Sequence, residues 1–126
     1  MKNKKQKLGY VDGFVFSVPK AKRAFYKKMA SEANEVWRKH GALDYKECRA
    51  DDVTPKGVTF TFPKMAKTKP GEEVWFSYIF YKSKAERNRI NKEVMAFFDK
   101  KYAGKDMDMP FDMKRFAMGG FNVEIG

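Results

Sequence analysis

The sequence is poor in the residues that build disulfides and most metal sites. Its 126 residues include one cysteine, Cys48, and one histidine, His40. A single cysteine excludes an intrachain disulfide, and no cysteine zinc motif is present. Cys48 falls inside a predicted strand, where we expect its thiol to be buried like a small apolar side chain.

Long apolar runs are also missing, so a membrane-spanning helix is not predicted. The lysine-rich residues 1–7 are not followed by an apolar stretch long enough for a signal peptide, because Asp12 and Gly13 interrupt it. From these two absences we expect a cytoplasmic protein without a membrane partner.

Acidic residues are outnumbered. Sixteen Asp and Glu residues stand against 27 Lys and Arg residues, which gives a formal net charge of +11 at pH 7. A basic surface attracts nucleic acid and other anions in general. The sequence has no RNP motif, recognition-helix pattern or zinc finger that would make this attraction specific. We interpret the charge as a solvated basic surface and do not predict a nucleic-acid partner.

The composition is nevertheless that of a folded domain. Apolar residues make up 43% of the chain and aromatic residues 16%, far more than a disordered chain contains. The length suits one domain. We predict a flexible basic tail over residues 1–8 and a single domain over residues 9–126.

Two segments, residues 10–18 and 73–81, carry apolar side chains on both of their alternating faces. Strands of this kind are typical of the centre of a sheet. Weaker strand patterns are found over residues 42–50, 58–67 and 115–125.

Two helices are predicted between the strands. Over residues 20–40, apolar side chains recur at helical spacing and form one stripe. The stripe consists of Phe25, Met29, Ala33, Val36 and Trp37. The second helix begins after Ser83, because Ser83 and Glu86 have the spacing of a capping box.

The order of these elements predicts an α+β fold. It matches the ferredoxin-like βαββαβ sandwich, whose antiparallel sheet has the strand order 4-1-3-2 and places the two most apolar strands in the middle. We expect the two helices to cover one face of the sheet. Aromatic side chains also point to the other face, and burying apolar surface stabilises a protein. We therefore predict a homodimer that packs the two open sheet faces together.

Asp12 is the most conspicuous polar residue of the predicted core. It lies on a central strand between apolar neighbours, and a buried carboxylate needs a partner or changes its pKa. We expect that partner to be Arg115, at the start of the last predicted strand. The pair is interpreted either as a structural salt bridge or as an acid/base or ligand anchor, which makes Asp12 and Arg115 the catalytic candidates.

Gly119 and Gly120 form a glycine pair inside the last predicted strand. Glycine in a strand allows another backbone or a ligand to approach closely, or marks a bulge. We expect this pair to lie beside Asp12 and treat both glycines as ligand-binding candidates.

No metal or cofactor is predicted. Aspartates gather in two segments: Asp51 and Asp52, then Asp106, Asp108 and Asp112. They lack the spacing of a calcium-binding loop. His40 is expected in the last turn of its helix, where a cation interacts favourably with the helix dipole. A haem ligand has to project inward from its helix, so we do not predict haem binding.

Several short motifs, taken together, point to one family. They are Tyr10-Val11-Asp12-Gly13-Phe14, Glu47-Cys48, Asp51-Asp52-Val53, Val74-Trp75-Phe76-Ser77-Tyr78, Ser83 with Arg87, Met109-Pro110-Phe111-Asp112, Lys114-Arg115 and Gly119-Gly120-Phe121. Through these motifs the chain, over about residues 9–122, resembles the YbaA-like proteins of the domain-of-unknown-function 1428 family. That family belongs to the dimeric α/β-barrel superfamily.

The resemblance implies a ferredoxin-like protomer and a homodimer in which two sheets form a barrel. It implies no established activity. The superfamily includes cofactor-free monooxygenases, haem-degrading enzymes, isomerases and stress proteins, and a shared fold does not fix the function. Two positions depart from the family pattern, since Arg49 replaces a usual Trp and Thr61 a usual Asp. If relatives line a pocket with those two residues, the pocket of this chain differs.

Three classes of function follow from these observations. The first is a protein that binds a small molecule or acts in a stress-associated role without catalysis. The second is a cofactor-independent monooxygenase or isomerase with a pocket between sheet and helices, and the third is a nucleic-acid-associated basic protein. We place the first ahead, because no catalytic constellation is evident. Ser77 and Asp112, which belong to the family motifs, join the glycine pair as ligand-binding candidates.

Overall fold

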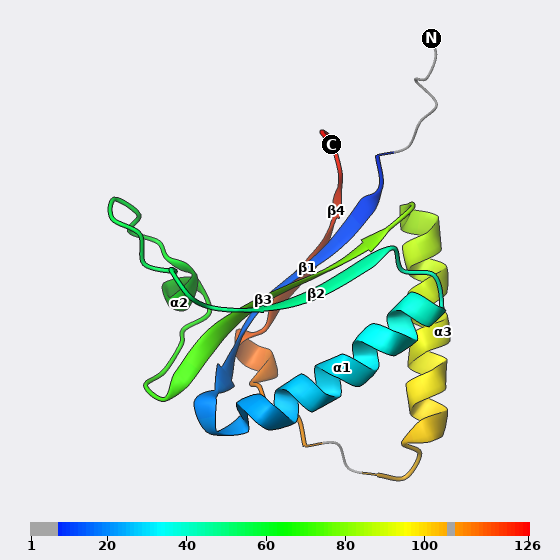
Figure 1. The fold of residues 1–126 in the computed structure, drawn as a ribbon, viewed down its shortest axis with the longest axis horizontal. Coiled ribbons are helices and arrows are strands. Elements are labelled where there is room, and N and C mark those ends of the chain that lie inside the picture. Colours follow the sequence, from blue (N-terminus) through cyan, green and yellow to red (C-terminus); the bar gives the residue numbers. More distant parts are fainter. Residues whose placement is uncertain (1–7, 106–107) are drawn as a thin grey trace.

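The structure is a computed structural model and describes residues 8–105 and 108–126. Four strands form one antiparallel sheet in the order β2-β3-β1-β4. The strands are β1 (Tyr10–Pro19), β2 (Asp44–Arg49), β3 (Glu72–Tyr81) and β4 (Ala117–Asn122). The helices are α1 (Arg23–Lys39), α2 (Phe62–Met65) and α3 (Lys84–Lys101), with short 3-10 turns η2 (Lys20–Lys22) and η3 (Met113–Arg115). The α+β ferredoxin-like prediction is confirmed (Figure 1).

The two central strands are those with apolar side chains on both faces. β1 and β3 pair along their whole length, from Tyr10 opposite Tyr81 to Pro19 opposite Glu72. β2 and β4 flank them as the edge strands. A central strand pairs with a neighbour on each side, and its side chains are better covered than those of an edge strand. Apolar residues are therefore tolerated at consecutive positions. The predicted strand order follows from that pattern and is confirmed.

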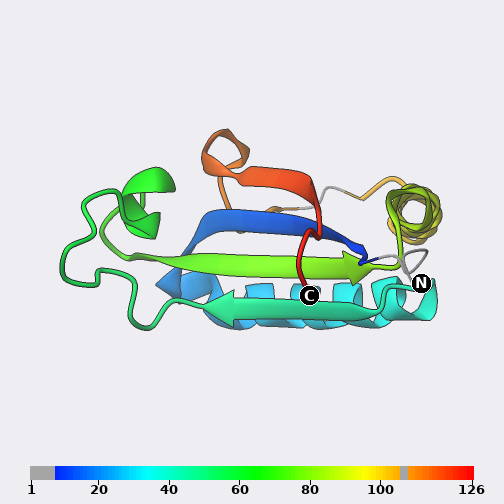
Figure 2. The ribbon, with the colours of Figure 1, turned by 90° about the horizontal axis from the view of Figure 1, so that it is seen from above.

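The helix α1 lies along one face of the sheet, which we call the inner face (Figure 2). Its buried side chains are Tyr26, Ala30 and Val36, whereas Phe25 is 47% exposed. The prediction that Phe25 belongs to the buried stripe is therefore wrong. The helix turns Tyr26 inward instead, because the hydroxyl of Tyr26 finds a carboxylate partner on β2 at Glu47.

The helix α3 begins after Ser83, whose hydroxyl accepts a hydrogen bond from the backbone N–H of Glu86 at 3.1 Å. The predicted N-cap is thus present. Figure 1 shows that α3 stands at one end of the sheet and runs steeply to α1, rather than beside it. Ile90 and Val94 of α3 are fully buried there. The second helix therefore covers one end of the inner face and leaves its middle to α1 alone.

The core on the inner face has two parts. One buried cluster lies where α1, α3 and the sheet meet and includes Tyr81 and Ile90. The other lies towards the start of α1 and includes Phe16, Tyr26 and Trp75. The two clusters sit at opposite ends of the inner face, with space between them.

Residues 58–67 do not form the predicted strand. They contain a loop and the short helix α2, with Thr61 as its N-cap and Pro63 in its first turn. Pro63 lacks the N–H that a strand ladder requires but suits a helix start. Ala66 at the end of this helix packs on Val15 and Val74, so the segment covers one end of the outer face of the sheet.

The last strand is shorter than predicted. β4 begins at Ala117, not at Arg115, because Asp112 caps the 3-10 turn η3 by accepting a hydrogen bond from the N–H of Lys114 at 2.9 Å. No helix within the described part of the chain is long and apolar enough to cross a bilayer.

Arg115 does not pair with Asp12, which corrects the prediction. Its guanidinium donates two hydrogen bonds to the carboxylate of Glu72, at 2.7 and 2.8 Å, and one to the carbonyl of Lys67 at 2.9 Å. It also donates to Asp112 at 3.2 Å. Arg115 sits in η3, before the strand begins, and this position directs its side chain to the start of β3. The residue ties the chain's last segment to the loop that follows α2.

This contact predicts an acid-sensitive contribution to stability. The hydrogen bonds from Arg115 hold the pKa of Glu72 below its usual value. Since the unfolded pKa is about 4.3, the carboxylate stabilises the fold above that pH and loses its effect as pH falls further. We expect Glu72→Gln to lower the free energy of unfolding at pH 7 by about 2 kcal/mol, and to reduce the loss of stability below pH 4.3.

Urea unfolding at several pH values measures both effects. Glu124→Gln is the matched control, because Glu124 is exposed near the C-terminus. A Glu72→Gln variant with the wild-type stability and pH profile would contradict the assignment.

Candidate functional site

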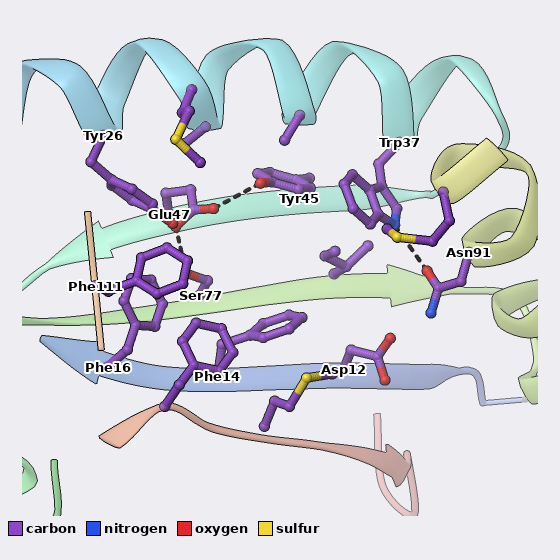
Figure 3. Close-up of a pocket in the computed structure, with 17 residues that line it drawn as sticks. Asp12, Phe14, Phe16, Tyr26, Trp37, Tyr45, Glu47, Ser77, Asn91 and Phe111 are labelled. Carbon is purple, nitrogen blue, oxygen red and sulfur yellow. Dashed lines mark hydrogen bonds between the residues drawn. The ribbon is translucent and has the colours of Figure 1, made fainter. Parts of the chain in front are cut away.

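A cavity of about 440 Å³ lies between the inner face of the sheet and α1, in the space between the two core clusters (Figure 3). All four strands contribute side chains to its wall, including Phe14 of β1, Glu47 of β2, Ser77 of β3 and Met118 of β4. α3 stands at one end of the sheet and contributes Asn91 and Met95 to the cavity wall.

Aromatic rings form much of its wall. Phe16 stacks on Phe116 with ring centroids 4.9 Å apart, and Phe111 packs against both, at 5.3 Å from Phe16 and 4.9 Å from Phe116. Phe111 and Phe116 come from the segment that leads into β4. The Pro-Phe-Asp motif thus supplies one wall of the cavity through Phe111, while Asp112 caps the next turn.

Glu47 is the main polar group of the cavity. The hydroxyl of Tyr26 on α1 donates to Oε1 and that of Tyr45 on β2 donates to Oε2, each at 2.7 Å. Ser77 on β3 donates a short hydrogen bond to Oε1. Three neutral hydroxyl groups from three elements therefore hold one carboxylate in place (Figure 3).

The electrostatics of this group keep the donors protonated. Burial, and next the negative charge of Glu47, raise the pKa of Tyr26 and of Tyr45 far above the usual value for tyrosine. Both hydroxyls therefore stay hydrogen-bond donors at any physiological pH. Within residues 8–105 and 108–126, Glu47 forms no ion pair.

Asp12 lines the opposite part of the cavity and is 2% exposed. Its ionic partner is Arg87, in the first turns of α3, with Nε 3.2 Å from Oδ1. Neither of these two atoms makes a hydrogen bond to the described residues, so the contact is electrostatic. Burial and the charge of Asp12 raise the pKa of the neighbouring Tyr81. Arg87 also lies over the ring of Tyr10, 5.0 Å from its centroid.

Asn91 of α3 supplies a second polar group near Asp12. Its side-chain carbonyl accepts hydrogen bonds from the indole of Trp37 and the hydroxyl of Tyr81, both at 3.1 Å. Because indole is only a donor, these contacts fix the orientation of the amide. The amide N–H groups make no hydrogen bond with the described residues and lie at the cavity wall.

The glycine pair behaves as two different residues. Gly120 lies opposite Asp12 in the β1–β4 register, and a Cβ there would overlap the Tyr10 hydroxyl and the Arg87 guanidinium. A Cβ on Gly119 would meet only the ring of Phe121, 4.0 Å away. The predicted close approach is found at Gly120, where the side chains of Tyr10 and Arg87 lie against the backbone. The β1–β4 pairing continues through both glycines without a bulge.

The structure brings together some of the predicted site residues. Asp12 and Ser77 line the cavity, and Gly120 lies opposite Asp12 on the neighbouring strand. Arg115 and Asp112 do not line it, and Gly119 turns towards the outer face with Phe121.

Glu47, Tyr26 and Tyr45 line the cavity but are not among the site candidates predicted from the sequence. The pairing of Tyr45 with Glu47 could have been predicted, because residues two positions apart on a strand point to the same face. The partner Tyr26 could not be found from the sequence, because its position on the inner side of α1 depends on where the helix begins.

Two further residues complete the comparison with the sequence. His40 is the C-cap of α1, with Nδ1 3.0 Å from a carboxylate oxygen of Glu93, and it does not line the cavity. Cys48 is exposed, which contradicts its predicted burial. Its side chain points to the outer face of the edge strand β2, which the described residues leave open there.

Metal ligands do not converge in the described ranges: no three His, Cys, Asp or Glu side chains lie close enough to share an ion. Asp106, one of the aspartates considered above, lies outside those ranges.

Comparisons with known proteins agree on a family and name no activity. A family described as "Protein of unknown function (DUF1428)" matches residues 9–113. The uncharacterized protein YbaA of Escherichia coli strain K12 is 43% identical over 116 residues, which cover 92% of this chain and 97% of that protein. The uncharacterized protein YbaA of Shigella flexneri matches with the same identity and coverage.

One solved structure resembles the fold. A dimeric ferredoxin-like protein from an uncultured marine organism matches 94% of this chain and 98% of its own, with a TM-score of 0.51 and 9% identity. At that identity the likeness concerns the fold alone.

The different surroundings of the two glycines predict different effects of the same substitution. We expect Gly120→Ala to lower the free energy of unfolding by about 1–3 kcal/mol, because the new methyl group must displace the buried Tyr10 and the partly buried Arg87. Gly119→Ala is the matched control and should change it by less than about 0.5 kcal/mol. Chemical unfolding measures the free energy of unfolding of both variants. Equal effects would show that the close packing at Gly120 does not exist.

Proposed function

The chain belongs to the DUF1428 family, which carries no assigned activity, and from the site itself we propose that it binds a small, largely apolar molecule. The binding site is the cavity between the inner face of the sheet and α1. Binding without catalysis is the function that the geometry supports best.

The observation that carries this proposal is an unfilled cavity with a ligand-sized volume. Pockets for small molecules usually measure about 300–1,000 Å³ and combine apolar walls with a few convergent polar groups. Here the volume is about 440 Å³ and the wall is made mainly of aromatic, methionine and other apolar side chains. Glu47 offers an acceptor on one side and Asn91 a free donor on the other.

Catalysis without a cofactor is the second candidate, and one observation favours it. A carboxylate at a cavity wall is suited to remove a proton from a bound substrate. Glu47 fits this role better than Asp12, because the charge of Asp12 is already balanced by Arg87. An isomerase or a cofactor-independent monooxygenase would use Glu47 in this way. Turnover that disappears in Glu47→Gln, while binding persists, would favour the enzyme.

We also infer that the protein is a homodimer that uses the outer face of the sheet. Phe76 of β3 is 45% exposed and Phe121 of β4 is 62% exposed, and both point to that face. Large apolar side chains gathered on one exposed face typically mark an interaction surface. The solved ferredoxin-like protein of similar fold is itself described as dimeric, which supports a dimer here.

Light scattering tests the dimer. We expect the wild-type protein to have about twice the chain mass of 14.7 kDa, and the double variant Phe76→Glu/Phe121→Glu to have the mass of one chain. Phe97→Glu on α3 is the control, because Phe97 is also exposed but lies away from the outer face. A monomeric wild type, or a double variant that stays dimeric, would contradict this interface.

A neutral fluorescent probe tests the cavity. N-phenyl-1-naphthylamine brightens in apolar sites, and we expect the wild-type protein to bind it. Ala33 lines the cavity, so Ala33→Phe should fill part of the space and weaken binding about tenfold or more. Ala24→Phe is the matched control, because Ala24 lies on the exposed side of the same helix. No binding by the wild type, or equal binding by both variants, would count against the cavity as the site.

A further inference from the structure

We propose that the molecule held in this cavity is an organic cation, with a protonated amine or an ammonium group against Glu47 and an apolar body among the aromatic rings. This inference rests on the proposed function and specifies the class of ligand.

The sheet directs three carboxylates of its strands to the inner face. Asp12 of β1 pairs with Arg87 at 3.2 Å. Glu73 of β3 accepts two hydrogen bonds from Arg23, both at 2.8 Å. Glu47 of β2 has only neutral hydroxyl partners within the described residues. It is the one member of this set whose negative charge is not balanced by an arginine.

A carboxylate without a cationic partner is an unfavourable arrangement in a partly buried position. A partly buried carboxylate is usually paired with a cation, and this chain has 27 Lys and Arg residues to choose from. Lys27 and Lys46 line a smaller hollow of about 240 Å³ on the other side of Glu47. Neither forms an ion pair with it, and Lys46 pairs with Asp44 at 2.6 Å instead. The position of the missing cation is therefore open to a ligand.

The Glu47 carboxylate has hydrogen-bonding capacity left over. An ionised carboxylate has about four lone-pair sites. Tyr26, Tyr45 and Ser77 occupy three of them. One acceptor site is left for an N–H group, and the carboxylate is held rigidly by the three hydroxyls, so little ordering is required when the ligand binds.

Aromatic rings surround the hydroxyl groups that hold Glu47. Tyr26 packs against Phe16 with ring centroids 5.5 Å apart and against Phe111 at 6.0 Å. The hydroxyl that holds Glu47 therefore belongs to a ring within this aromatic group. Ring faces attract organic cations, most strongly where water is excluded. The carboxylate can therefore bind the positive charge of an amine while the aromatic rings contact the carbon skeleton of the same molecule.

Three probes of nearly equal shape test the charge preference. They are 4-phenylbutylamine, 4-phenylbutan-1-ol and 4-phenylbutyrate, measured by displacement of N-phenyl-1-naphthylamine. We expect the amine to bind about tenfold more tightly than the alcohol, and more tightly still than the acid. The net charge of +11 favours the opposite ranking, so non-specific attraction cannot produce this result.

Substitutions at Glu47 test its role. Glu47→Gln keeps the shape and should reduce the affinity for the amine to that for the alcohol, while Glu47→Asp keeps the charge and should retain the preference. Glu35→Gln on the exposed side of α1 is the control and should behave like the wild type. If neither Glu47 variant folds by circular dichroism, the ranking of the three probes by the wild type still decides the cation claim.

The outcomes separate this inference from the proposal beneath it. If the neutral fluorescent probe does not bind, the cavity is not a binding site and both fail. If the probe binds but the amine has no advantage over the alcohol, only the cation inference is overturned. An amine preference that survives in Glu47→Gln overturns the assignment to Glu47.

Discussion

The ion pair between Asp12 and Arg87 fixes the position of α3, and the cavity depends on that position. Asp12 lies near the start of the central strand β1 and Arg87 in the first turns of α3, so their contact holds the start of the helix at one end of the sheet. A buried carboxylate in this place needs a cation, and the first turns of α3 cannot move away without removing it. Gly120 provides the room that Tyr10 and Arg87 require beside Asp12. With α3 held at the end, α1 alone spans the middle of the inner face, and the space between the two core clusters stays open.

The carboxylates on the inner face of the sheet have two kinds of partner. Asp12 and Glu73 are paired with arginines, whereas Glu47 is held by three hydroxyls and faces the cavity with its charge unbalanced among the described residues. This difference in partners makes Glu47 the carboxylate that we propose for ligand binding. Membership of the DUF1428 family gives the fold a context, and the proposed ligand follows only from the site.

The fold could be predicted from the sequence because its signals are local and repeated. Apolar residues on both faces of residues 10–18 and 73–81 indicated the central strands, and Ser83 marked the start of α3. Side-chain partners were harder to predict, because they depend on where an element begins. Arg115 falls in a 3-10 turn two residues before β4 and turns to Glu72 rather than Asp12. Tyr26 replaces Phe25 on the inner side of α1 through a similar shift, and with it the partner of Glu47 was missed.

A crystal structure of the protein grown with 4-phenylbutylamine tests the central claim most directly. We predict electron density in the cavity, with the amine nitrogen within hydrogen-bond distance of Glu47 and the phenyl ring against Phe16, Phe111 and Phe116. A structure in which those phenylalanine side chains themselves fill the space, or in which the amine binds only elsewhere, would contradict the account.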